Sequence, residues 1–240
     1  MKIISRNSEG ISPAVLSGFI FLLRTGGHLI VVILPNPPIH KDMSSVVILK
    51  YNAGNVQSVM YALDRIGASY QLSDDPDTLR SADRIIFPGV GEASTAMQSL
   101  RANGLDRLIP TLKQPFLGTC VGMQLLCRSS EEGPTNCLGV FDVPVLKFPP
   151  TPGFKIPQTG WNNLHNIRTS LCDGLPTEPY VYYNHGYYVP LCDDTVAQTT
   201  YMLPYSAMLQ KKNFIACQFH SEISGQVGQQ IFKNFLQLSI

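Results

Sequence analysis

Apolar residues follow two alternating patterns from residue 46 to about residue 126. Short apolar runs predict buried strands at 46–49, 70–72, 84–87 and 115–117. Apolar side chains at three- and four-residue spacing predict helices at 56–66, 77–82 and 93–103, with a shorter one ending near residue 113. Because strands joined by helices form parallel sheets covered on both faces, this half of the chain predicts an α/β fold.

The pattern changes after about residue 137. Short β-like runs between turns rich in proline and glycine predict hairpins at 143–148, 180–183, 187–189, 195–200 and 207–209. A last core strand is expected at 214–219, and 227–238 has the apolar stripe of a closing amphipathic helix. The predicted architecture is therefore α/β, with a mostly parallel central sheet flanked by helices and antiparallel hairpin strands added in the second half.

Residues 1–42 do not share this pattern, so we expect an N-terminal extension before a domain at 43–240. Basic residues before the apolar run at 14–23 are a feature of signal peptides, but no small-x-small cleavage motif follows. A membrane span is a second interpretation, which the charge and the glycine pair in mid-segment disfavour. We favour a third, that Met43 is the true start and that the extension is disordered or weakly ordered.

Composition narrows the functional classes. The formal net charge is +1, and no stripe of lysine and arginine is interleaved with aromatics, which argues against nucleic acid as the main partner. The six cysteines form no CxxC pair and lie near no histidine at metal-ligand spacing, so we expect no metal site. No motif in the sequence signals a cofactor, and we expect none. Unpaired thiols are typical of a reducing compartment, and the predicted location is cytoplasmic.

One cysteine carries a motif. Residues 118–122, Gly-Thr-Cys-Val-Gly, join an apolar run to a helical pattern. This is the cysteine form of the Gly-x-Ser-x-Gly nucleophile elbow, in which glycines permit a turn too tight for a Cβ. Backbone N–H groups at the start of the helix favour thiolate over thiol at Cys120 and can receive an oxyanion.

A base and an orienting group follow the last core strand. Residues i and i+2 of a strand point the same way, so we expect His220 and Glu222 to share a face. In parallel sheets the ligand crevice lies beyond the carboxyl ends of the strands, where three glycine-bearing turns also fall, at 51–55, 88–91 and 118–122. A thiol nucleophile needs a base, and the base needs a group that fixes its tautomer. Cys120, His220 and Glu222 therefore predict a catalytic triad.

From Met43 to its end the chain resembles the class I (triad) glutamine amidotransferases. Within that class it is most similar to the glutaminase subunits of imidazole glycerol phosphate synthase, the HisH type. The stretches that carry the resemblance are 51–55, 88–91, 118–124, 160–162, 184–188 and 218–222. The elbow and the His-x-Glu pair identify the class, whereas the Gly-Asn, Pro-Gly-Val-Gly and Gly-Trp-Asn stretches identify the histidine-biosynthesis branch.

The resemblance implies the class I glutamine amidotransferase fold and a glutaminase activity. The Cys120 thiolate would attack the carboxamide of L-glutamine, His220 would carry the proton, and Glu222 would orient the imidazole. An oxyanion hole of backbone N–H groups is expected from Val121 and from the turn of Gly89, Val90 and Gly91. Glutamine contacts are expected from Gln124, Gly118 and His185. Contacts with the partner or the ammonia path are expected from Asn52, Asn55, Trp161 and Asn162.

A partner is implied as well. The family's ammonia passes through a (β/α)8-barrel synthase subunit of the HisF type, bound as a heterodimer, to a phosphoribosyl-formimino substrate. The products are imidazole glycerol phosphate and aminoimidazole carboxamide ribotide, so the assembled enzyme is a lyase. Several positions depart from the family pattern: Gln158 replaces a usual His, Ser221 a usual Pro and Ile223 a usual Lys. In addition, residues 184–187 are Asn-His-Gly-Tyr where the family usually has Val-His-Ser-Tyr.

Three alternatives accompany this interpretation. One is a glutaminase subunit that serves anthranilate, aminodeoxychorismate, purine or pyridoxal synthesis. The second is a non-catalytic scaffold with an amidotransferase-like fold, which the intact triad disfavours. The third is a free-standing γ-glutamyl hydrolase, which predicts activity without a partner.

Overall fold

The computed structural model describes residues 18–25, 28–35, 45–51 and 55–238. The chain divides into two compact units, Met1–Met43 and Ser44–Ile240. In the first unit, β1 (Gly18–Thr25) pairs antiparallel with β2 (His28–Pro35). The sequence predicts an N-terminal extension and a domain at 43–240, and this division stays a prediction.

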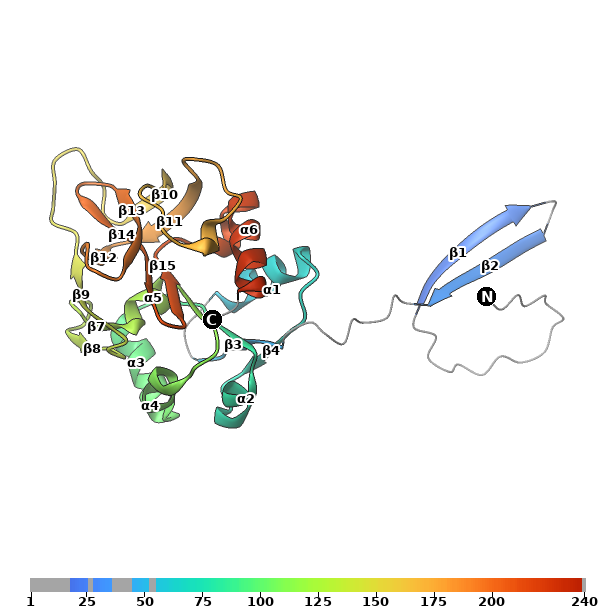
Figure 1. The fold of residues 1–240 in the computed structure, drawn as a ribbon, viewed down its shortest axis with the longest axis horizontal. Coiled ribbons are helices and arrows are strands. Elements are labelled where there is room, and N and C mark those ends of the chain that lie inside the picture. Colours follow the sequence, from blue (N-terminus) through green and yellow to red (C-terminus); the bar gives the residue numbers. More distant parts are fainter. Residues whose placement is uncertain (1–17, 26–27, 36–44, 52–54, 239–240) are drawn as a thin grey trace. The chain divides into compact units, whose positions relative to one another are not determined.

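The second unit is built on a central sheet. Its seven strands, among the described residues, lie in the order β13-β14-β15-β6-β5-β3-β4. They span Val46–Leu49 (β3), Tyr70–Ser73 (β4), Arg84–Phe87 (β5), Phe116–Thr119 (β6), Thr195–Thr200 (β13), Pro204–Lys211 (β14) and Phe214–Cys217 (β15). Pairing from β4 to β15 is parallel, whereas β13 and β14 add antiparallel strands at one edge (Figure 1). The sheet confirms the mostly parallel α/β fold predicted from the alternating patterns.

Helices cover both faces of this sheet because its inner strands are apolar on both faces. In β3, Val47 and Leu49 pack into one core cluster and Val46 and Ile48 into the other. The helices are α1 (Val56–Arg65), α2 (Pro76–Ser81), α3 (Ala93–Ala102), α4 (Leu105–Leu108), α5 (Val121–Leu126) and α6 (Gly225–Gln237). The first cluster contains apolar residues of α3, α4 and α5, and the second contains those of α1 and α6, which lie side by side in Figure 1.

Short 3₁₀ turns and two small sheets complete the unit. The turns are η1 (Ile109–Thr111), η2 (Ser170–Cys172) and η3 (Ser221–Ile223). One small sheet has the order β12-β9-β7-β8, from Tyr187–Tyr188 (β12), Phe141–Lys147 (β9), Cys127–Ser130 (β7) and Thr135–Asn136 (β8). The other pairs β10 (Gln158–Asn163) with β11 (Tyr180–His185).

Two sequence predictions differ from these elements. The last core strand ends at Cys217 rather than at residue 219, because the chain leaves the sheet before η3 begins. The strands β7, β8 and β10 were not predicted. In β10 only Gln158 is buried, so the stretch lacks the apolar alternation by which a strand is recognised.

Candidate active site

Cys120 lies on the turn between β6 and α5. Its φ of 52° and ψ of −113° are strained for a residue with a side chain. The turn is tight because it packs directly on the chain that follows β5: a Cβ on Gly122 would overlap the carbonyl oxygen of Phe87, and one on Gly89 would overlap the nitrogen of Gly122. The Tyr51 hydroxyl donates to the carbonyl of Pro88 at 2.7 Å and ties the end of β3 to the same turn. The elbow predicted from the two glycines is confirmed.

The side chains of His220 and Glu222 are buried and joined. Nδ1 of His220 lies 2.7 Å from Oε1 of Glu222. The route to this contact differs from the predicted one, because Glu222 lies in the 3₁₀ turn η3 and not on a strand. Within the described residues, Oε2 of Glu222 is buried without a hydrogen-bond partner, so the bond through Oε1 is the one that holds the carboxylate. Arg65 donates to the carbonyl of Glu222 at 3.0 Å and helps to fix the turn.

The electrostatics of His220 favour its charged form. Burial opposes the charge, but the hydrogen bond and negative charge of Cys120, together with those of Glu222, outweigh it and raise the pKa of His220 from 6.5 to about 10. The imidazole is therefore protonated at neutral pH in this arrangement. A buried imidazole that a carboxylate orients beside a cysteine is the arrangement of a cysteine nucleophile with its base.

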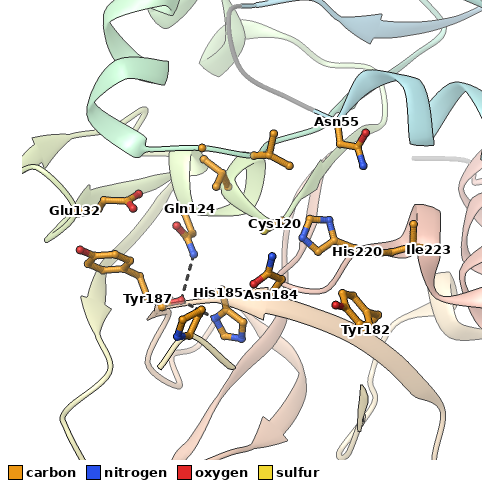
Figure 2. A pocket seen from close by; sticks show the side chains of 15 residues that line it. Asn55, Cys120, Gln124, Glu132, Tyr182, Asn184, His185, Tyr187, His220 and Ile223 are labelled. Carbon is orange, nitrogen blue, oxygen red and sulfur yellow. Dashed lines mark hydrogen bonds between the residues drawn. The ribbon is translucent and has the colours of Figure 1, made fainter. Parts of the chain in front are cut away.

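Cys120 and His220 face a cavity of about 500 Å³ (Figure 2). Five other residues singled out in the sequence line it: Asn55, Val90, Gly91, Val121 and Gln124. His185 lines it from the opposite side, next to Asn184 and Tyr187. Gly89 and Gly118 do not line the cavity and instead pack against the elbow. Trp161 and Asn162 lie on β10 and are not among the lining residues, and Asn52 lies outside the described residues.

Side chains on the two sides of the cavity are linked by hydrogen bonds. Gln124 donates from Nε2 to the carbonyl of Tyr187 at 3.2 Å, the dashed line in Figure 2, and to Oε1 of Gln218 at 3.0 Å. Nδ1 of His185 contacts the same Tyr187 carbonyl at 2.7 Å. Burial lowers the pKa of His185 to about 4, against the effect of that bond. His185 is therefore neutral, and Nδ1 carries its proton because a carbonyl only accepts.

Sequence reasoning missed Glu132, whose carboxylate lines the cavity. Its Oε2 accepts from the N–H of Ala93 at 2.8 Å, at the start of α3. Burial raises the pKa of Glu132, although the bond to Ala93 opposes the change. The only sequence signal is an acidic pair before Gly133, which is indistinguishable from a solvated turn. Tyr182 and Asn184 also line the cavity. Asn184 lies in the stretch 184–188 that carries the family resemblance, but neither side chain was assigned to the site from the sequence.

The described part of the chain contains neither a membrane-spanning helix nor a cluster of metal-ligating side chains. None of its helices is long and apolar enough to cross a membrane. In the same residues, no three of the His, Cys, Asp and Glu side chains are grouped in a way that could hold a metal ion.

Comparisons with known proteins agree with this geometry. Residues 47–238 match the family model "Glutamine amidotransferase class-I". The chain is 50% identical over 194 residues to the imidazole glycerol phosphate synthase subunit HisH of Bacteroides thetaiotaomicron, covering 80% of this chain and 99% of the relative. It is 44% identical over 195 residues to the same subunit of Yersinia pseudotuberculosis, with the same two coverages.

Solved structures show the same fold at lower identity. A structure described as a glutamine amidotransferase has a TM-score of 0.61 at 18% identity, covering 80% of this chain and 97% of that one. PurLQS from Thermotoga maritima has a TM-score of 0.57 at 19% identity, covering 81% and 98%. The chain belongs to the class I glutamine amidotransferase family and, within it, to the HisH subunits of imidazole glycerol phosphate synthase.

Proposed function

We propose that Cys120, His220 and Glu222 are the catalytic triad with which this HisH-type subunit hydrolyses L-glutamine to glutamate and ammonia for histidine biosynthesis. The observation that carries the assignment is the buried 2.7 Å bond between His220 and Glu222, with His220 and the strained elbow cysteine lining the same cavity. The subunit is an enzyme of the glutamine amidotransferase class, and the ammonia that it releases serves a synthase.

The proposed reaction proceeds through a thioester. The Cys120 sulfur attacks the carboxamide carbon, and the imidazolium of His220 gives its proton to the nitrogen as ammonia leaves. His220, now neutral, takes a proton from water, whose oxygen attacks the thioester carbon. Glutamate and the Cys120 thiolate are released, and His220 is again protonated. Glu222 keeps the imidazole in one orientation throughout, because its Oε1 holds Nδ1.

Backbone N–H groups are proposed to hold the tetrahedral oxyanion. Val121 begins α5 directly after the nucleophile and lines the cavity, as do Val90 and Gly91 on the facing turn. Gly89 would contribute by letting that turn approach the elbow, since a Cβ there would overlap Gly122.

The substrate's polar groups have partners in the cavity. We assign its α-ammonium to the carboxylate of Glu132, the one acidic side chain among the described residues that line the cavity. Both N–H groups of Gln124 are already engaged, so this residue offers its amide oxygen to a ligand. His185 donates from Nδ1 to the Tyr187 carbonyl, and its part is to hold Tyr187 in place. Gly118 shapes the elbow from behind.

The proposed partner is a HisF-type (β/α)8-barrel subunit in a heterodimer, with imidazole glycerol phosphate and aminoimidazole carboxamide ribotide as products. Exposed apolar side chains near the cavity support a docking face: Trp161 is 48% exposed, Tyr180 52% and Ile223 43%. The Trp161 and Tyr180 rings stack within 6° of parallel. Ile223 lines the cavity itself, with Asn55 nearby, so a partner on this face would cover the mouth.

A cytoplasmic location belongs to the proposal. All six cysteines of the sequence lie in the described residues and are free thiols, as in proteins of a reducing compartment. We also propose that residues 43–240 form the catalytic domain, supported by the family match over 47–238.

The test is glutamate release from glutamine by the full chain, alone, with a HisF-type barrel, and with the barrel plus its phosphoribosyl-formimino ligand. Cys120→Ala removes the nucleophile, and Cys137→Ala is the matched control at a thiol outside the cavity lining. Activity that needs partner and ligand, and that only Cys120→Ala abolishes, supports the proposal. Comparable activity alone indicates a free-standing hydrolase. Absence of activity in every combination indicates another acceptor pathway or a scaffold.

A further inference from the structure

Gln218 lies directly beside the nucleophile. Strand β15 pairs in parallel register with β6, with Cys217 opposite Thr119, and the N–H of Cys120 donates to the Cys217 carbonyl at 2.8 Å. Gln218, which follows Cys217, is therefore a neighbour of Cys120, which follows Thr119. Gln218 is fully buried, and its Nε2 donates to the sulfur of Cys120 at 3.9 Å.

The amide of Gln218 is held so that its donor faces the sulfur. Its Oε1 accepts from Nε2 of Gln124 at 3.0 Å. Rotating the amide by half a turn would put two N–H donors against each other at Gln124 and an oxygen against the thiolate. Both changes are unfavourable, so the hydrogen bond that Oε1 accepts from Gln124 determines the orientation of the Gln218 amide.

Gln124 is fixed in turn by a series of buried groups. The Tyr187 carbonyl that accepts from Gln124 also accepts from Nδ1 of His185. Nε2 of His185 lies 3.3 Å from the hydroxyl of Tyr205, which donates to Oε1 of Gln158 at 2.9 Å. The series, from Gln158 through Tyr205, His185, the Tyr187 carbonyl and Gln124 to Gln218, leads from β10 to the catalytic sulfur.

We propose that Gln218 is a positioning residue for the nucleophile, a neutral donor that holds the Cys120 sulfur in its thiolate form and directs it into the cavity. This role rests on the proposed function of Cys120. Gln218 differs from His220 because it gives up no proton. It can donate to the sulfur when the thiolate attacks and again when water expels the thiolate from the thioester.

The experiment measures alkylation of Cys120 in the full chain by iodoacetamide against pH, with neither glutamine nor partner present. The sulfur–carbon bond forms as iodide leaves, and mass spectrometry of the Cys120 peptide gives the rate. Cys137 and Cys172 interfere little near neutral pH, because burial raises the pKa of Cys137 to about 11 and that of Cys172 to about 12.

Three variants are compared. Gln218→Met removes the amide at similar length, and Gln218→Glu keeps its shape and the acceptor for Gln124 but replaces the N–H donor with oxygen. Gln114→Met is the matched control, because it removes a glutamine amide that donates to Leu79 far from the site. Circular dichroism and thermal unfolding report whether each variant folds.

The proposal expects both Gln218 variants to be alkylated roughly tenfold more slowly at neutral pH, the size of a hydrogen bond to a charged group. The rise of the alkylation rate with pH should move to higher pH in both Gln218 variants, whereas Gln114→Met should match the parent. A folded Gln218→Met or Gln218→Glu with the parent's rate and profile overturns the proposal. If Gln218→Met fails to fold, the isosteric Gln218→Glu decides. If the parent protein is alkylated normally but has no glutaminase activity, the result counts against the proposed function and not against the role of Gln218.

Discussion

The two sides of the cavity are built by different means. On one side lie the turns after β5 and β6, with Val90, Gly91 and Val121, which we call the backbone wall. On the other lie residues 184–187 of the hairpin strands, with Gln158 and Tyr205 behind them, which we call the side-chain wall. The backbone wall is shaped by glycines that let main chains touch, and the side-chain wall by buried hydrogen bonds. Added side-chain volume should therefore destabilise the backbone wall, whereas the loss of a hydrogen-bond partner should destabilise the side-chain wall.

The largest stability effect is expected on the backbone wall. In Gly122→Ala the new Cβ overlaps the Phe87 carbonyl, which belongs to the central sheet and cannot move freely. We expect a loss of more than about 3 kcal/mol in the free energy of unfolding, the upper end of overpacking costs. Urea denaturation measures it.

A glycine on the side-chain wall provides the control. A Cβ at Gly186 would meet only the Ile156 side chain, at 3.7 Å. Gly186→Ala should change the free energy of unfolding by about 0.5 kcal/mol or less. Equal costs for the two variants would remove the distinction between the walls.

Acid should weaken the side-chain wall through His185. Its pKa is lowered to about 4, so the folded state resists a proton that the unfolded chain binds near pH 6.5. The stability from neutral His185 is present above pH 6.5 and is lost as pH falls toward 4, by roughly 3 kcal/mol at 1.4 kcal/mol per pH unit. Urea denaturation of the parent and of His185→Gln over this range measures the difference.

The matched variant is His165→Gln, which changes an exposed histidine. It should keep the parent's loss of stability between pH 6.5 and 4, whereas His185→Gln should flatten it. A parent and a His185→Gln variant with parallel pH profiles would contradict the assignment of His185 as a buried neutral group.

A smaller effect is expected from the hydroxyl behind His185. Tyr205→Phe removes the donor to Gln158 and leaves Nε2 of His185 without that contact. An unsatisfied buried group costs about 1–2 kcal/mol in the free energy of unfolding. Tyr201→Phe, at an exposed hydroxyl that donates to Lys155, should cost less than about 0.5 kcal/mol in the same measurement. Similar costs at the two tyrosines would show that the buried series contributes little.

The two walls also differ in how far the sequence predicts them. The Gly-x-Cys-x-Gly spacing and the alternating apolar runs predict the backbone wall because local periodicity and glycine placement determine it. The side-chain wall depends on residues 20 or more positions apart: the buried Gln158 accepts at Oε1 from Tyr205, 47 residues away. No local pattern marks Gln158 as part of a strand, or Glu132 as part of a cavity.

The triad stands between these cases. The residue types at 120, 220 and 222 predict their chemistry, yet strand periodicity suggested the wrong route to the contact between His220 and Glu222. A 3₁₀ turn closes that contact. Chemistry constrains which groups must meet, whereas the backbone path between them depends on where the chain leaves the sheet.

The most direct test of the account is where an electrophilic glutamine analogue, a γ-diazoketone, attaches in a preparation that hydrolyses glutamine with its barrel partner. The account predicts one adduct, on Cys120, formed far more slowly in Glu222→Gln because the imidazole is no longer held by a carboxylate. Attachment at another thiol, or unlabelled Cys120 in a fully inactivated sample, would contradict it.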